Sequence, residues 1–240
     1  MIYLSPIERR LRRRRRLRIG AFLLGGLILC LLLDRAAFQT LAPLLPAENA
    51  DELNRVDKLR YEGRDWSRML RVVGYAPTWL VLSAALLLVD LRARTASPGR
   101  EPIRRAASIA ASVLVAGIVA EFVKLVVGKE RPISGDLYTG GELRVFLGGF
   151  ADPSNLGFPS SHTAVAFAGA AAAAILWRPA APILFLLAAG CGLTRMLAGA
   201  HWLSDVYGGA VVGIITAQLV AIPVAGATAE RSPARFGRIG

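Results

Sequence analysis

The chain has 240 residues, 54% of them hydrophobic, and its mean hydropathy is +0.47. This composition is too apolar for an ordinary soluble domain and indicates a polytopic membrane protein. The net charge of +12 is concentrated at one end, because eight arginines between Arg9 and Arg18 leave 21 basic against 17 acidic residues elsewhere.

The arginine run at the N-terminus is open to two interpretations. A run of this kind could bind nucleic acid. It adjoins an apolar segment, Ile19–Phe38, so a cytoplasmic anchor facing anionic lipids is the simpler interpretation, and we expect no nucleic-acid partner. Ile19–Leu33 also has the length of a signal-peptide core. No compact small-x-small site directly follows it, so a retained first span is favoured over cleavage.

Six segments are apolar enough to be helices that cross a bilayer, which requires roughly 20 residues. They are Ile19–Phe38, Val72–Leu91, Ala106–Val127, Thr163–Trp177, Ala181–Thr194 and Val206–Val224. The fourth and fifth are short and are separated only by Arg178-Pro179-Ala180, which predicts a helical hairpin. The predicted fold is therefore all-α, a bundle of six transmembrane helices.

The distribution of Lys and Arg predicts the orientation, because these residues accumulate in cytoplasmic connections. Basic residues concentrate in the N-terminal segment, in the connection Arg92–Arg105, at Arg178 and in the C-terminal tail. Both termini are thus predicted to be cytoplasmic, and we expect the inner (plasma) membrane of a bacterium.

The outer connection, residues 39–71, carries balanced charge. Its apolar residues recur at near-helical spacing, which predicts a short amphipathic helix on the outer surface. This helix could line a lipid entrance or be an ordinary solvated helix. The apolar residues concerned are Leu53, Val56, Leu59, Trp66 and Met69.

The chain has only two histidines, and both lie in polar stretches at the ends of apolar segments. His201 and Asp205 are four residues apart, which places them on one face if a helix begins here. A carboxylate bonded to one ring nitrogen fixes the tautomer and makes the other nitrogen a better nucleophile. The alternative is an interfacial helix start, with Trp202 as a membrane-belt residue and Asp205 as a cap.

The second histidine closes the stretch Pro159-Ser160-Ser161-His162, which precedes an apolar helix. Serine at this place could simply cap the helix. The same free N–H groups also bind phosphate. His162 would then stand beside the bound group as a general acid.

Cations lie at the neighbouring segment ends. Lys124 lies at the end of the third span, Arg131-Pro132 follows that span, and Arg195 follows the fifth. Each could be an ordinary interfacial residue, but together they could neutralise phosphoryl oxygens. Glu121 lies three residues before Lys124 and could orient it. The predicted topology places all these motifs on the outer side, so we expect one site at the outer membrane–water interface.

Together the motifs resemble those of the type 2 phosphatidic acid phosphatase superfamily, integral-membrane lipid phosphate phosphatases related to vanadium haloperoxidases. The signature of that family is Lys-x6-Arg-Pro, then Pro-Ser-Gly-His, then Ser-Arg-x5-His-x3-Asp. This chain has the residues of the signature in the same order and spacing, with two departures: Ser161 replaces Gly, and Thr194 replaces Ser.

The resemblance implies that His201 attacks phosphorus and forms a phosphohistidine, that Asp205 orients His201, and that His162 protonates the leaving group. The phosphate would be held by Lys124, Arg131, Ser160, Arg195 and the backbone N–H of Ser161. No metal and no cofactor is implied, and the two cysteines, Cys30 and Cys191, have no metal-ligand spacing.

We therefore divide the chain into a basic cytoplasmic segment (1–18), a first span with the outer amphipathic loop (19–71), a phosphatase core (72–224) and a cytoplasmic tail (225–240). The predicted function is that of a metal-independent membrane hydrolase that cleaves a lipid phosphate or lipid pyrophosphate on the periplasmic or extracellular face. Two alternatives stay open: a lipid phosphotransferase with the same intermediate, and a non-catalytic phosphate-binding membrane protein or transporter. The sequence does not predict the oligomeric state.

Overall fold

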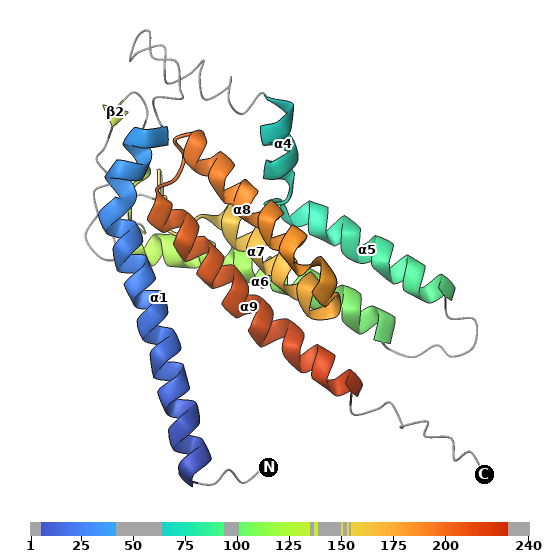
Figure 1. Cartoon of the computed structure of the whole chain (residues 1–240). Helices are drawn as coiled ribbons and strands as arrows, with labels where there is room; N and C mark the ends of the chain where they lie inside the picture. Colours follow the sequence, from blue (N-terminus) through green and yellow to red (C-terminus); the bar gives the residue numbers. More distant parts are fainter. Residues whose placement is uncertain are drawn as a thin grey trace, which may run out of the picture.

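A computed structural model describes residues 6–41, 64–93, 101–134, 137–138, 150, 153 and 155–229. Its elements are α1 (Pro6–Leu41), α4 (Asp65–Val72), α5 (Ala76–Ala93), α6 (Glu101–Val127), β1 (Ile133–Ser134), β2 (Leu137–Tyr138), α7 (Ser161–Leu176), the 3-10 helix η4 (Arg178–Ala180), α8 (Ala181–Leu197) and α9 (Leu203–Ala229). The described residues are all-helical, as predicted, apart from a two-residue antiparallel pairing of β1 with β2 (Figure 1) and an isolated bridge between Glu130 and Leu156.

The helices are those of an integral membrane protein. Four are long and apolar enough to cross a bilayer: Arg10–Leu41, Pro102–Val127, Arg178–Leu197 and Leu203–Ala221. A fifth results if α4 and α5, bent by 63° from one another, form one broken span. Helix α7 has 16 residues and is therefore about 24 Å long, which is less than a typical hydrocarbon core. The described residues thus give four or five candidate spans, and the sixth stays a prediction.

Helix α7 is the centre of the bundle and packs against α6, α8 and α9 (Figure 1). Its alanine-rich sequence presents small side chains on every side, and most of them are fully buried. Gly209 and Gly213 let α9 approach closely, because a Cβ at Gly213 would lie 2.4 Å from the Ala164 carbonyl oxygen. This close packing of small residues is typical of helices in lipid. The expected hairpin is present, with η4 joining α7 to α8.

The helix boundaries differ from the predicted apolar segments in two ways. Most helices are longer, since a helix continues beyond the apolar residues that lie in lipid; α6, for example, begins at Glu101 rather than Ala106. The second segment was predicted to begin at Val72, but Val72 ends α4 and the second long helix begins at Ala76. The break is a turn in which the Gly74 N–H bonds the Arg71 carbonyl oxygen at 2.9 Å.

The structure describes only the C-terminal part of the predicted amphipathic helix, and this part is α4. Trp66 and Met69 lie on this helix and are exposed, whereas Leu70 packs against Gly190 of α8. The other three residues of the predicted pattern, Leu53, Val56 and Leu59, lie outside the described residues. The described part is therefore a helix that is docked on the bundle by one face.

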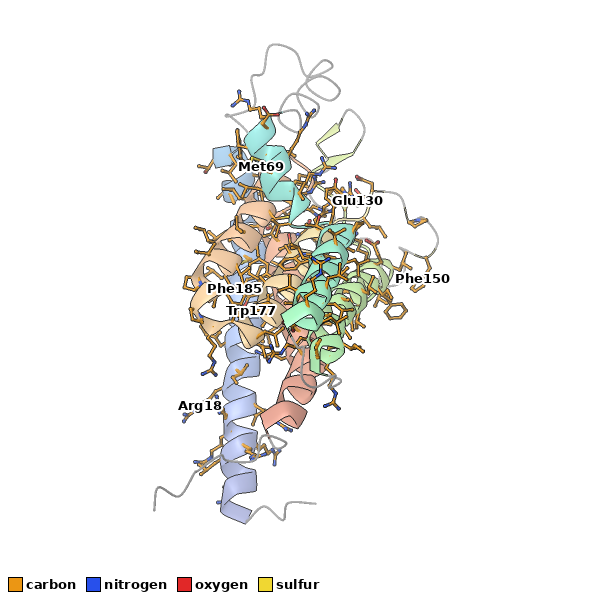
Figure 2. The ribbon with its side chains drawn as sticks, turned by 90° about the vertical axis from the view of Figure 1, so that its right-hand side faces the viewer. Arg18, Met69, Glu130, Phe150, Trp177 and Phe185 are labelled. Carbon is orange, nitrogen blue, oxygen red and sulfur yellow. The ribbon has the colours of Figure 1, made fainter. Side chains whose placement is uncertain are left out.

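Helix α1 contacts the bundle through α9. Its arginine-rich part is exposed, and a row of large apolar side chains, including Phe22 and Leu32, also faces outward. Such a surface on a long apolar helix is typical of contact with lipid. In Figure 1 the start of α1 lies at the opposite end of the molecule from α4, and in Figure 2 Arg18 lies far from Met69 of α4 and from Glu130.

Candidate active site

The predicted site residues meet at one end of the bundle. The end of α6, the start of α7, the end of α8 and the start of α9 carry them, and these four ends lie together because helices that follow one another in the chain run in opposite directions (Figure 1). In this way residues between positions 124 and 205 are brought to one place.

His201 and Asp205 form a buried pair. The His201 Nδ1 lies 3.3 Å from Asp205 Oδ2, and the two side chains are 2% and 0% exposed. Asp205 Oδ2 also accepts the backbone N–H of Trp202 at 3.0 Å, so the carboxylate caps α9 and orients the imidazole at once. The alternative of a membrane-belt Trp202 is wrong, because this ring is buried and its Nε1 donates to the Glu130 carbonyl oxygen at 2.9 Å.

The stretch that carries Arg131 is held against the stretch that precedes α7. The Gly157 N–H donates to the Lys129 carbonyl oxygen at 2.7 Å, and the Arg131 N–H donates to that of Asn155 at 3.1 Å. Gly157 is required here, because a Cβ at this position would lie 2.6 Å from Asp205 Oδ2. These bonds place the two stretches beside the His201–Asp205 pair.

The start of α7 presents polar atoms that are buried. The Ser160 N–H donates to the Asp205 carbonyl oxygen at 2.9 Å, which ties this loop to α9. Ser160 makes no side-chain capping bond, so simple capping does not explain its hydroxyl. Within the part of the chain that the structure describes, Ser160 Oγ and His162 Nε2 are buried without a hydrogen-bond partner. Buried polar atoms without a partner are uncommon in folded proteins, so these two atoms are available to a ligand.

Lys124 is held as its spacing from Glu121 predicts. Its Nζ lies 2.8 Å from Glu121 Oε1. It also donates to Ser161 Oγ, and the Ser161 hydroxyl in turn donates to Glu121. The serine that departs from the family signature thus joins the Lys124–Glu121 pair. By contrast, the Thr194 hydroxyl bonds the Cys191 carbonyl oxygen at 2.7 Å, within its own helix.

The remaining cations surround the histidines. Arg131 and Arg195 are close enough to act electrostatically on His201, and Arg195 and Lys124 act on His162. A further cation, Arg71 at the end of α4, also acts on His162 and was not among the predicted site residues. Tyr75 follows it and meets the His162 ring edge-on, with centroids 5.0 Å apart.

Burial controls the protonation of His201, which lies between α8 and α9. Burial lowers the pKa of this imidazole to about 4, although Asp205 acts in the opposite direction. The ring is therefore neutral at neutral pH, the form in which a ring nitrogen has a free electron pair.

Sequence reasoning missed two side chains that lie behind Asp205. Lys129 Nζ is 3.3 Å from Asp205 Oδ1, and Asp34 of α1 pairs with Lys129 at 2.7 Å. A signal for Asp34 was present, because a carboxylate inside an apolar segment is costly and defaults to a functional role.

The fold defines an integral membrane protein in which two histidines and several cations gather at one end of the bundle. A family model for the PAP2 superfamily matches residues 105–226, about half of the chain, and the chain belongs to this family. The match runs from α6 into α9 and is consistent with phosphatase-type activity on phosphate esters. Searches of curated proteins and of solved structures gave no significant match. Both α1 and α4 lie outside the matched residues.

Proposed function

We propose that the protein is a metal-independent membrane phosphatase that hydrolyses a lipid phosphate or lipid pyrophosphate through a phosphohistidine. The observation that carries this proposal is the buried His201–Asp205 pair with Nδ1 facing the carboxylate. Because Nδ1 is held in this way, the proton resides there and Nε2 keeps the electron pair that attacks phosphorus.

The reaction has two steps. His201 Nε2 forms a bond to phosphorus while the bond from phosphorus to the leaving oxygen breaks, and His162 gives its proton to that oxygen. Water then attacks phosphorus and the P–N bond breaks, with His162 taking the proton from water. Both steps follow from one nucleophile and one acid–base group, and the chain has only two histidines.

The phosphate oxygens need positive charge, which fixed cations supply. Lys124, Arg131 and Arg195 would neutralise them, and the Ser160 hydroxyl and the Ser161 N–H would complete the cradle. The orphaned Ser160 Oγ supports this assignment. Guanidinium groups bind phosphate oxygens in pairs, which suits a group that passes through a five-coordinate state.

The site would lie at the outer membrane–water interface, on the periplasmic face of a bacterial inner membrane, in a bundle of six spans. The start of α1 and the end of α9 lie at the end of the bundle away from the site, which supports cytoplasmic termini (Figure 1). The exposed arginines of α1 would then contact anionic lipids of the inner leaflet. The substrate would enter from the outer leaflet.

A substrate panel tests this function. Detergent-purified protein is mixed with phosphatidate, phosphatidylglycerol phosphate, a polyprenyl pyrophosphate and lipid A, and released phosphate is measured with and without an added alcohol. Phosphate release in water supports a phosphatase. Transfer to the alcohol alone would instead establish a phosphotransferase, and binding of inorganic phosphate without turnover would establish a non-catalytic protein.

Topology gives an independent prediction. A reporter enzyme that is active only outside the cytoplasm should be active when fused after residue 140 and silent when fused after residue 98. The reason is the excess of arginine in the connection between α5 and α6. The reverse pattern would place the site on the cytoplasmic side and contradict the proposal.

The proposed metal independence gives a further testable prediction. Phosphate release should persist in excess chelator, because Lys and Arg side chains supply the positive charge. Vanadate should inhibit, since it adopts the five-coordinate geometry of the transition state. Activity that disappears with chelator and returns with Mg²⁺ would show that the cations are insufficient.

A further inference from the structure

Asp34 is a buried carboxylate on α1, a helix that is otherwise largely exposed. It is 6% exposed, and it follows the apolar run Leu31–Leu33 and precedes Arg35. Its Oδ1 accepts the Ser204 N–H at 2.8 Å, and its Oδ2 accepts the Ser204 hydroxyl at 2.7 Å and Lys129 Nζ at 2.7 Å. Both oxygens are thus bonded by residues that adjoin the site, and the cost of burying the charge is offset by this pairing.

Lys129 is also buried, at 5% exposure, and all of its donors are used. An ammonium group has three N–H donors. They reach Asp34 Oδ2, Ser204 Oγ at 2.5 Å and Asp205 Oδ1 at 3.3 Å. The ammonium also lies 5.5 Å from the centre of the Trp202 ring. All three N–H donors of Lys129 are therefore used by protein groups, so this ammonium has none left for a phosphate oxygen.

These contacts form a row of alternating charge that ends at the imidazole. Asp34 pairs with Lys129, Lys129 with Asp205 Oδ1, and Asp205 Oδ2 with His201 Nδ1. Two carboxylates and one ammonium leave a net charge of −1 beside His201. That charge matches the single positive charge that the ring gains when Nε2 bonds to phosphorus.

We propose that Asp34 and Lys129 are positioning residues for the reaction: they fix the orientation of Asp205 and set the net charge beside His201. Helix α1 then completes the site rather than serving only as a membrane anchor. This inference rests on the proposed function of His201 as the nucleophile.

Other charged groups also face His201. Asp205 comes from α9, Arg195 from α8, Arg131 from the stretch after α6 and His162 from α7. All four stay unchanged in the variants below. Any difference in the pKa of His201 or in turnover among those variants is therefore caused by the changes at Asp34 and Lys129.

Two single variants change the net charge of the row in opposite directions, and a double variant restores it. Asp34→Asn makes the net charge of the row zero and should lower the pKa of His201 below its wild-type value. Lys129→Met leaves two facing carboxylates and should raise that pKa above its wild-type value of about 4. The double variant returns the row to −1 and should return the pKa toward wild type. Each single variant should lower turnover by about 10–100-fold, the usual effect of removing a group that orients a functional side chain, and the double variant should recover part of the loss.

The measurement is an NMR titration of the ¹⁵N-labelled His201 ring in detergent micelles, alongside phosphate release as a function of pH. Tyr207→Phe is the matched control. It removes the bond from Tyr207 Oη to the Leu23 carbonyl oxygen at 3.1 Å, so it loosens α1 without a change of charge. Its titration and turnover should be close to wild type.

Opposite pKa shifts in the single variants, reversed in the double variant, support the inference. Shifts in one direction only, unchanged titration, or a Tyr207→Phe protein that behaves like Asp34→Asn would overturn it. If Lys129→Met does not fold, Asp34→Asn compared with the double variant still decides. Wild-type protein that turns over no substrate would refute the proposed function, whereas the titration tests the charge row independently of activity.

Discussion

Replacing His201 with alanine or glutamine is expected to abolish phosphate release and the covalent phosphoenzyme for every substrate. In the proposed reaction the imidazole Nε2 is the atom that bonds to phosphorus. The chain has only one other histidine, His162, and the proposal assigns it to proton transfer. Loss of a covalent nucleophile typically lowers turnover by at least about 10⁴-fold. The measurement is acid-labile, base-stable phosphoprotein after a rapid quench, together with steady-state phosphate release.

His201→Gln is the matched variant in this experiment. Glutamine keeps an amide that can bond Asp205 and fills much of the same buried space, but it has no electron pair able to attack phosphorus. Its thermal stability should therefore be nearer to wild type than that of His201→Ala, while both are inactive. A phosphoprotein that persists in either variant would place the nucleophile elsewhere.

Replacing His162 with alanine is expected to have an effect that depends on the leaving group. General acid catalysis supplies about 10²–10⁴-fold, so an alkyl phosphate should lose activity in this range. A nitrophenyl ester or a pyrophosphate should lose much less, because a good leaving group needs little protonation. The measurement is the ratio of variant to wild-type turnover across a series of leaving groups.

Tyr75→Leu provides the control for this series. It removes the ring that meets His162 edge-on but keeps the acid. Any loss should therefore be similar for all leaving groups. If His162→Ala loses the same factor for every substrate, the residue positions phosphate and does not donate a proton.

The meeting of the predicted residues at one end of the bundle could be predicted because helices in a membrane reverse direction at each span. The end of α6 and the start of α7 therefore face the same side, as do the end of α8 and the start of α9. Motif spacing added the local pairs: Lys124 with Glu121, and His201 with Asp205, are both within bonding distance. The Lys124–Glu121 contact lies within one turn of α6 and depends only on helix geometry. His201 precedes α9, which begins at Leu203, so its contact with Asp205 also depends on the backbone before that helix.

Contacts between helices could not be predicted in the same way. A span that is apolar on every side carries no periodic signal that tells which face turns inward. The central position of α7 and the docking of α4 on α8 are consequences of packing that hydropathy does not record. The break between α4 and α5 was missed for a related reason, because Val72 to Tyr75 read as part of a continuous apolar segment.

The sequence by itself determined the membrane class, the all-α fold and the family, since each depends on composition or on the spacing of a few residues. Only the tertiary structure decided that Asp34 bonds Lys129, 95 residues later in the chain, and that this pair stands behind Asp205. The physical reason is that a buried carboxylate must find a partner, but the sequence does not specify which of several cations the folded helices will bring to it.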